Sequence, residues 1–143
     1  MDAHTEVILI NGFLGSGKTT LLNRLIKAIP GSYRVAVLMN EFGEIGIDGS
    51  MLQGEDLDIV EVSRGSIFCI CVKTDFIKAL HKIGNDIRPD LLIMEPSGVA
   101  NPGDLKADFR MPLFRDRFRL LDQVCILDGV CFEDAYHAFV SVE

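Results

Sequence analysis

A short loop near the start of the chain combines glycines, a lysine and a threonine at a fixed spacing. The segment from Gly12 to Thr19 reads Gly-Phe-Leu-Gly-Ser-Gly-Lys-Thr and matches the pattern G-x-x-x-x-G-K-[ST]. Gly12, Gly15 and Gly17 permit backbone conformations that a β-carbon hinders, so successive N–H groups can surround a phosphate. Lys18 would reach the β- and γ-phosphates of a nucleotide, and the Thr19 hydroxyl would ligate Mg²⁺. The alternative, a glycine-rich turn before a helix, needs neither the lysine nor the threonine.

The predicted nucleotide contacts extend beyond these glycines. Ser16 within the loop and Thr20 directly after it are included among them, and a second segment supplies an acid. Glu95 directly follows the apolar run Leu91-Leu92-Ile93-Met94, where a carboxylate at the end of a buried strand would face the phosphates and their Mg²⁺. Gly98, three residues later, could offer its amide to a γ-phosphate. The alternative for Glu95 is a carboxylate in solvent, and Asp128 repeats the strand-then-acid pattern more weakly.

Several apolar stretches are continuous instead of alternating, which is typical of strands whose two faces are both covered by helices. We expect an α/β fold with a mostly parallel sheet flanked by helices, the three-layer, Rossmann-like arrangement of a P-loop NTPase. Predicted strands cover residues 6–11, 34–39, 57–62, 90–95 and 123–128; predicted helices cover 21–29, 72–83, a short piece between Pro102 and Pro112, and an amphipathic stretch over 132–142. The glycine-rich segment 40–54 is predicted to be a long functional loop.

Composition limits what such a fold could do. The 143 residues fit one nucleotide-binding domain over 1–143, and a net charge of −7 argues against nucleic acid as a partner. Apolar runs are too short for a membrane span, and no basic region precedes the first of them, so we expect a cytoplasmic protein with no membrane partner. The four cysteines are then interpreted as free thiols or metal ligands.

Three blocks together resemble the CobW-type GTPases of the SIMIBI class, which are related to the nickel-insertion GTPases UreG and HypB. They are the phosphate loop continued to Leu22, the segment Asn40-Glu41-Phe42-Gly43-Glu44-Ile45-Gly46-Ile47-Asp48, and Glu95-Pro96-Ser97-Gly98-Val99-Ala100-Asn101-Pro102. The resemblance covers residues 5 to 130, with the blocks in family order. A glutamate before x-x-G is a hallmark of that group.

The resemblance implies roles that the residues alone do not. Residues 40–48 would form a nucleotide-responsive switch, with Asp48 near the Mg²⁺ and Glu41 near the nucleotide or a metal, so Glu41 joins Lys18 and Glu95 as a candidate catalytic residue. Family members carry a G-C-x-C-C motif that binds Zn²⁺, Co²⁺ or a similar ion. Here only Cys69 and Cys71 follow Gly65, at displaced positions.

The two cysteines leave two interpretations open. Cys69 and Cys71 could both bind Zn²⁺ or Co²⁺, with further ligands from Glu41, His81, a partner chain or a cargo protein, because a closed zinc site needs four ligands. Alternatively, they are small apolar residues leading into a helix. Cys125 and Cys131 are expected to be core residues.

GTPases of this kind select guanine with an N/S-K-x-D motif, which this chain lacks. We therefore expect a domain truncated before that motif, with GTP as its nucleotide by resemblance alone. The expected function is Mg²⁺-dependent GTP hydrolysis coupled to delivery of a metal or metallocofactor to a client metalloenzyme. The alternatives are an ATP-dependent small-molecule kinase, and a nucleotide-gated activator that transfers no metal. Oligomeric state is not indicated.

Overall fold

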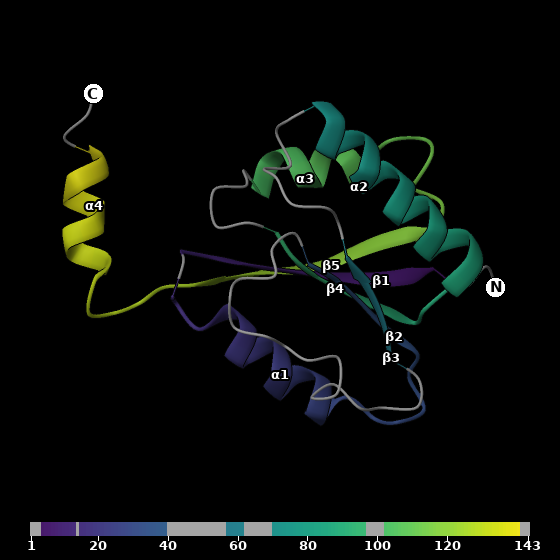
Figure 1. Ribbon diagram of the computed structural model, residues 1–143, viewed down its shortest axis with the longest axis horizontal. Coiled ribbons are helices and arrows are strands. Elements are labelled where there is room, and N and C mark those ends of the chain that lie inside the picture. The colour runs from purple at the N-terminus through teal and green to yellow at the C-terminus, as the bar shows by residue number, and fades with distance from the viewer. Residues whose placement is uncertain (1–3, 14, 40–56, 62–69, 97–101, 141–143) are drawn as a thin grey trace.

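The computed structural model describes residues 4–13, 15–39, 57–61, 70–96 and 102–140, and its centre is a five-stranded sheet (Figure 1). The strands are β1 (Thr5–Gly12), β2 (Val35–Met39), β3 (Leu57–Glu61), β4 (Leu91–Glu95) and β5 (Phe118–Ile126). Their order in the sheet is β3-β2-β4-β1-β5, and each neighbouring pair is parallel. The carboxyl ends of β1 and β4 are therefore adjacent at one edge, where parallel α/β proteins bind ligands.

Helices cover both faces of this sheet, which gives three layers (Figure 1). Helix α1 (Lys18–Ala28) lies on one face, while α2 (Ile70–Lys82) and α3 (Pro102–Phe109) lie on the other. Helix α2 continues into a π-helical turn, η2 (Ile83–Ile87). Helix α4 (Phe132–Val140) stands beyond the end of the sheet at which the strands finish. Among the described residues, no helix has the length and apolarity needed to cross a membrane.

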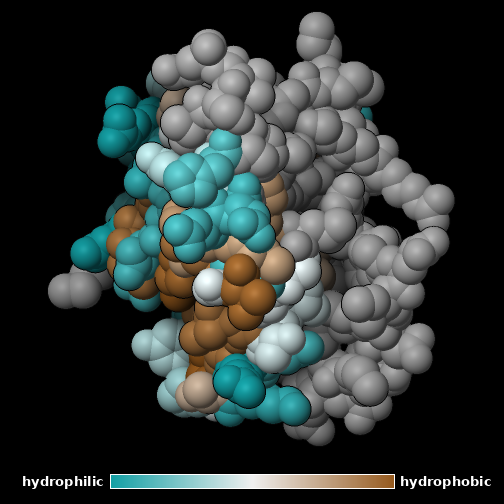
Figure 2. Space-filling view, turned by 90° about the vertical axis from the view of Figure 1, so that its left-hand side faces the viewer, coloured by the Kyte–Doolittle hydropathy of each residue, from teal (hydrophilic) through white to brown (hydrophobic). Residues whose placement is uncertain are grey.

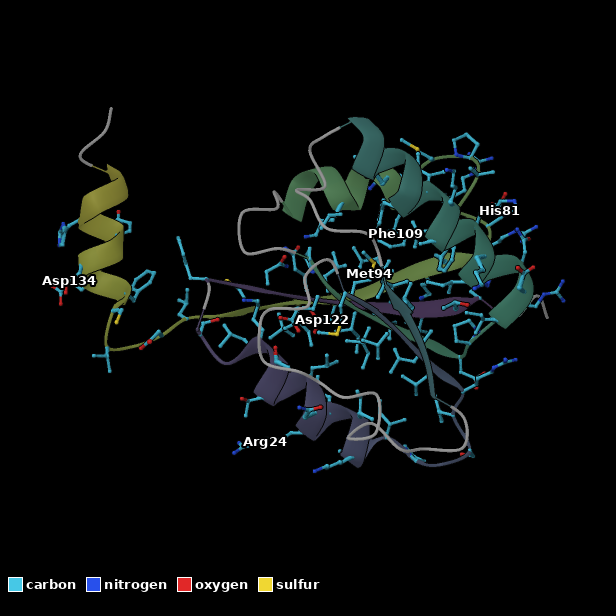
Figure 3. All side chains as sticks on the ribbon, in the orientation of Figure 1. Arg24, His81, Met94, Phe109, Asp122 and Asp134 are labelled. Carbon is cyan, nitrogen blue, oxygen red and sulfur yellow. The ribbon has the colours of Figure 1, made fainter. Side chains whose placement is uncertain are left out.

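Apolar side chains form a separate core on each face of the sheet. The core under α2 and α3 includes Leu9 of β1, Met94 of β4 and Phe109 of α3, and Figure 3 shows Met94 and Phe109 between the sheet and these helices. The core under α1 includes Ile10, Leu22 and Ile93. Since Leu9 and Ile10 are consecutive, β1 buries both of its faces, which explains why the strand reads as a continuous apolar run.

The predicted α/β architecture is confirmed, and two elements differ in extent. β5 begins at Phe118 and ends at Ile126, whereas strand 123–128 was expected. Among the described strands it pairs with β1 alone, as an edge strand, and it exposes Arg119 and Asp122, so its first half lacks the apolar run that marks a fully buried strand. The second helix continues beyond 83 as η2 and ends at Arg88, which has a left-handed φ of 48° and donates its N–H to the Ile83 carbonyl.

The two C-terminal cysteines contradict the prediction that they are core residues, because Cys125 and Cys131 are both exposed. Cys125 lies near the end of the edge strand β5, and Cys131 lies in the turn before α4, none of whose described side chains belongs to either core. Apolar side chains gather on the face that carries α4 (Figure 2). Val130 is 87% exposed there, and Leu127 and Phe132 are also exposed.

Candidate nucleotide-binding site

The loop after β1 closes against the neighbouring strand at a position that only glycine can fill. Gly12 pairs with Ile126 of β5 and has a φ of 147°. A β-carbon on Gly12 would lie 2.5 Å from the Ile126 carbonyl oxygen and 2.7 Å from Ser16 Oγ. Both the backbone conformation and the space therefore require glycine here.

Gly15 and Gly17 are required for a different reason. Their φ values are 79° and 94°, in the left-handed region, but a β-carbon on either would have nothing within 4 Å. Gly17 precedes α1 without a side-chain hydrogen bond to cap the helix, and the first turn of α1 carries no acid. The N-terminal N–H groups of α1 and the partial positive charge of its dipole are thus available to an anion in the loop.

Lys18 is the first residue of α1 and lies inside the loop, with only 8% of its surface exposed. Its Nζ donates a hydrogen bond of 2.9 Å to the Phe13 carbonyl oxygen. Among the described residues, no carboxylate lies within ion-pair distance of this ammonium group. A buried ammonium with one neutral acceptor is costly, and a phosphate oxygen in the loop would compensate its charge.

Thr19 and Glu95 bring the phosphate loop and the end of β4 together. Thr19 Oγ1 lies 3.4 Å from each carboxylate oxygen of Glu95, at the long limit for a hydrogen bond. Burial raises the pKa of Glu95 above the ordinary value for a glutamate, against the opposing effects of the Lys18 charge and the Thr19 hydrogen bond. Burial therefore disfavours the carboxylate form, and a divalent cation beside Glu95 would offset that cost.

Two polar side chains at the base of the loop are buried without partners. Within the described part of the chain, both amide atoms of Asn11 and the Oγ of Ser16 have no hydrogen bond. Asn11 is 8% exposed and is the last residue of β1 before Gly12. Asn11 is not among the site residues predicted from the sequence, although a polar residue that ends an apolar strand beside the phosphate loop is a usable signal.

The remaining predicted site residues divide into those the structure places and those it does not. Thr20 is exposed on α1, and Asp128 is exposed and accepts the Val130 N–H at 2.9 Å, so it caps a turn. Glu41, Asp48, Cys69 and Gly98 lie outside the described residues. No group of three or more His, Cys, Asp or Glu residues within the described ranges could hold a metal ion.

His81 does not belong with the cysteines as a metal ligand. Cys71 lies in the first turn of α2, and His81 lies ten residues later on the same helix. At 1.5 Å per residue the two positions are about 15 Å apart along the axis, too far to bind one ion. The expectation that His81 could complete a site with Cys71 is therefore wrong.

Comparison with known proteins agrees with this geometry. The family model described as "CobW/HypB/UreG, nucleotide-binding domain" matches residues 6–139. A protein of Sinorhizobium named "Zinc chaperone CobW" is 39% identical over 129 residues, covering 85% of this chain and 36% of the relative. "Zinc chaperone YeiR" of Escherichia coli is 35% identical over 87% of this chain and 38% of its own length.

A eukaryotic relative is also similar. "Zinc-regulated GTPase metalloprotein activator 1" of Schizosaccharomyces pombe is 43% identical over 110 residues, covering 72% of this chain and 26% of its own length. The chain thus spans about a third of the length of these relatives. The matched region includes the phosphate loop and the strand that carries Glu95.

Proposed function

Because the chain belongs to the CobW/HypB/UreG nucleotide-binding domain family, we propose that it binds GTP with Mg²⁺ in the loop from Gly12 to Thr19 and hydrolyses it. The observation that carries this proposal is the convergence of the glycine loop, the buried Lys18 and the Thr19–Glu95 pair at one edge of the sheet. Each supplies one part of a triphosphate site: backbone N–H groups, a positive charge, and oxygen ligands for a divalent ion.

In the proposed mechanism, the protein positions the phosphates and supplies positive charge. Lys18 exchanges the Phe13 carbonyl for the β- and γ-phosphate oxygens and stabilises the negative charge that spreads over them during transfer. The N-terminal N–H groups of α1 hold the phosphates in place. Thr19 and Glu95 would hold Mg²⁺, which would supply positive charge against the negative charge that develops on the phosphates. Glu41, Asp48 and Gly98, with Ser16 and Thr20, remain the proposed further contacts.

The proposed purpose of this hydrolysis is delivery of a metal, with Zn²⁺ ahead of Co²⁺, to a client metalloprotein. The support is the printed names of the relatives, which call them zinc chaperones and a zinc-regulated activator. Cys69 and Cys71 are the proposed thiolate ligands for the transported ion, because closely spaced thiolates suit borderline ions such as Zn²⁺. The rest of the ligand set would come from other residues or from the client.

Calorimetric titration of the chain with GTP and with ATP, each with Mg²⁺, tests the nucleotide. Tighter binding of GTP, with slow release of inorganic phosphate, is the expected result. A preference for ATP together with transfer to a small-molecule acceptor would support the kinase alternative.

A separate titration with Zn²⁺ against a chromophoric chelator tests the cargo. Stoichiometric binding by the wild type that is lost in the double variant Cys69→Ser/Cys71→Ser is expected. Zinc binding that persists in the double variant would place the ion elsewhere. A chain that binds GTP but no Zn²⁺ or Co²⁺ would support the nucleotide-gated activator.

A further inference from the structure

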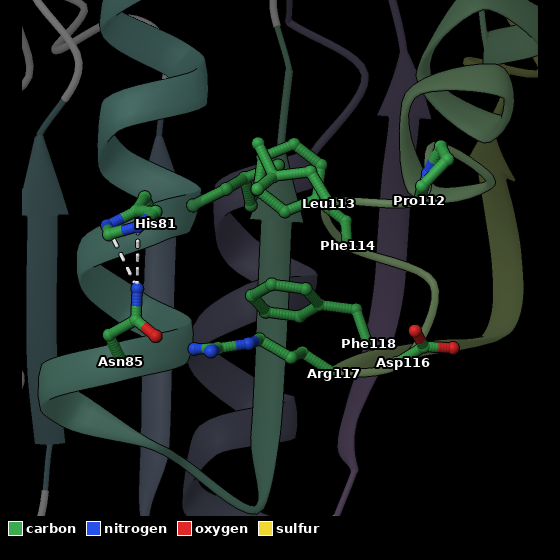
Figure 4. Close-up of a pocket in the computed structure, with 9 residues that line it drawn as sticks. His81, Asn85, Pro112, Leu113, Phe114, Asp116, Arg117 and Phe118 are labelled. Atoms are coloured by element: carbon green, nitrogen blue, oxygen red, sulfur yellow. Dashed lines mark hydrogen bonds between the residues drawn. The ribbon is translucent and has the colours of Figure 1, made fainter.

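A pocket lies at the end of the sheet opposite the phosphate loop, between η2 and the segment that leads into β5 (Figure 4). Its position follows from the register of β1, in which Thr5 pairs with Phe118 at the pocket and Gly12 pairs with Ile126 at the loop. Thr5 and Gly12 are seven positions apart along β1, about 23 Å at 3.3 Å per residue. Figure 3 shows His81, which lines the pocket, at this far end of α2. A ligand here would not compete with a nucleotide.

The pocket has an apolar floor. Leu80 of α2, Phe114 and Phe118 are all buried and line it, with a volume of about 240 Å³. Apolar surface continues outside the pocket, because Leu113 at its edge is 54% exposed. The volume lies below the ~300–1,000 Å³ of small-molecule sites. An apolar side chain of a longer molecule, which could also cover Leu113, fits this shape better than a free small ligand does.

The rim of the pocket is polar and carries an uncompensated positive charge. The Arg117 side chain extends toward η2 (Figure 4), and its Nη1 donates only a long hydrogen bond of 3.4 Å to the Gly84 carbonyl. The neighbouring acid, Asp116, is paired instead with Arg115 at 3.5 Å. On the other side of the rim, a His81 ring nitrogen lies 2.9 Å from the Asn85 amide nitrogen. Among the described residues, Arg117 has no carboxylate partner.

The chain around the pocket also carries more positive than negative charge. Residues 78–119 hold eight of the 14 Lys and Arg residues and six of the 21 Asp and Glu residues, a net charge of +2, although the whole chain has a net charge of −7. Of these eight, Lys82, Arg115, Arg117 and Arg119 are exposed close in sequence to the pocket lining. A locally basic surface on an acidic protein favours acidic partners. Other copies of this chain are also acidic, so this surface repels them less than the rest of the protein surface does.

We propose that this pocket binds a short acidic segment of a partner protein. One apolar side chain of the segment, such as leucine, methionine or phenylalanine, enters the pocket over Leu80 and Phe118. An adjacent Asp or Glu forms a bidentate pair with the Arg117 guanidinium, the geometry that arginine favours with carboxylates. Because the site is remote from the phosphate loop, this interaction does not depend on the proposed nucleotide function.

Selection of peptides from a random dodecapeptide phage library against the full chain tests the proposal. The selected peptides are labelled, and their binding affinities are measured by fluorescence anisotropy. We expect peptides in which Asp or Glu neighbours an apolar residue. Arg117→Glu should weaken their binding by about tenfold or more, since a charge-assisted pair becomes a repulsion. The control is Arg119→Glu, which changes an exposed arginine two residues away that does not line the pocket and should leave affinity unchanged.

Gly84→Ala tests the apolar part with a substitution that changes no charge. A β-carbon on Gly84 would lie 3.1 Å from two ring atoms of Phe118, so this ring, which lines the pocket, would have to shift. Weaker binding with an unchanged far-ultraviolet spectrum is expected. Peptides without acids, equal binding to Arg117→Glu, or no selected peptide would overturn the proposal.

The same test can show that one of two other ligands occupies the pocket, and either result would overturn the proposal. A dimer in sedimentation that Arg117→Glu abolishes would assign the pocket to a second copy of the chain. Binding of free N-acetyl-aspartate as tight as that of the peptides would assign it to small anions.

Discussion

Thr19 and Glu95, which are 76 residues apart in the sequence, lie with the threonine hydroxyl 3.4 Å from both carboxylate oxygens. The contact exists because β1 and β4 are parallel neighbours, with Leu9 paired to Met94, so the chain reaches the same edge of the sheet at the end of each strand. A helix that starts after β1 and an acid that ends β4 are thereby brought together without any local sequence signal that joins them.

The pH dependence of stability follows from Glu95. Burial raises its pKa in the folded chain above the unfolded value, so the folded state holds the proton to higher pH. The contribution of Glu95 to folding stability is fully present below the pKa of the unfolded chain and is lost as the pH rises through the raised pKa of the folded chain. Glu95→Gln removes this dependence, so the nucleotide-free variant should gain stability relative to the wild type as the pH rises.

Urea unfolding from about pH 4 to pH 8 measures this difference. Glu133→Gln, at an exposed acid in the first turn of α4, is the control and should track the wild type throughout. A difference between Glu95→Gln and the wild type that does not change with pH would show that burial does not raise the pKa of Glu95.

Gly12→Ala should destabilise the chain by about 3 kcal/mol, because it adds a clash with the Ile126 carbonyl to a strained backbone conformation. Gly31→Ala is the matched control: a β-carbon there has nothing within 4 Å, and its change in the free energy of unfolding should stay within about 0.5 kcal/mol. Equal effects of the two substitutions would contradict the described geometry of the loop.

Asn11→Leu should stabilise the nucleotide-free chain by about 1 kcal/mol or more, because it replaces a buried amide without partners by an apolar group of similar size. Asn11→Asp should do the opposite at neutral pH, since it buries a charge. Chemical denaturation of both variants gives the comparison. Destabilisation by leucine would mean that the Asn11 amide has hydrogen-bond partners in solution.

Much of the fold could be predicted because the central strands are continuous apolar runs bounded by turns. β2 and β4 bury nearly every side chain and β1 leaves none fully exposed, so the local pattern identifies them. The start of β5 could not be predicted in the same way, because an edge strand tolerates Arg119 and Asp122 on exposed positions. The exposure of Cys125 was missed for the same reason: apolar neighbours indicate a core only where another layer covers them.

The site was predictable only in part. The phosphate loop is local in sequence, so its glycines, Lys18 and Thr19 could be assigned from spacing alone. The unpartnered state of Asn11 and the 3.4 Å approach of Thr19 to Glu95 depend on strand register, which no local pattern encodes. The pocket beside Arg117 depends on the same long-range pairing, since its two sides come from η2 and from the residues that precede β5.

If the loop from Gly12 to Thr19 holds a triphosphate through Lys18, calorimetry with Mg²⁺ and a non-hydrolysable GTP analogue should detect the loss of this one side chain. Lys18→Ala should lower the affinity by roughly tenfold to a hundredfold, because it removes a charge-assisted contact. Lys27→Ala, at an exposed lysine in the last turn of the same helix, should bind like the wild type. Unchanged affinity in a folded Lys18→Ala variant would show that the loop does not hold the triphosphate through Lys18.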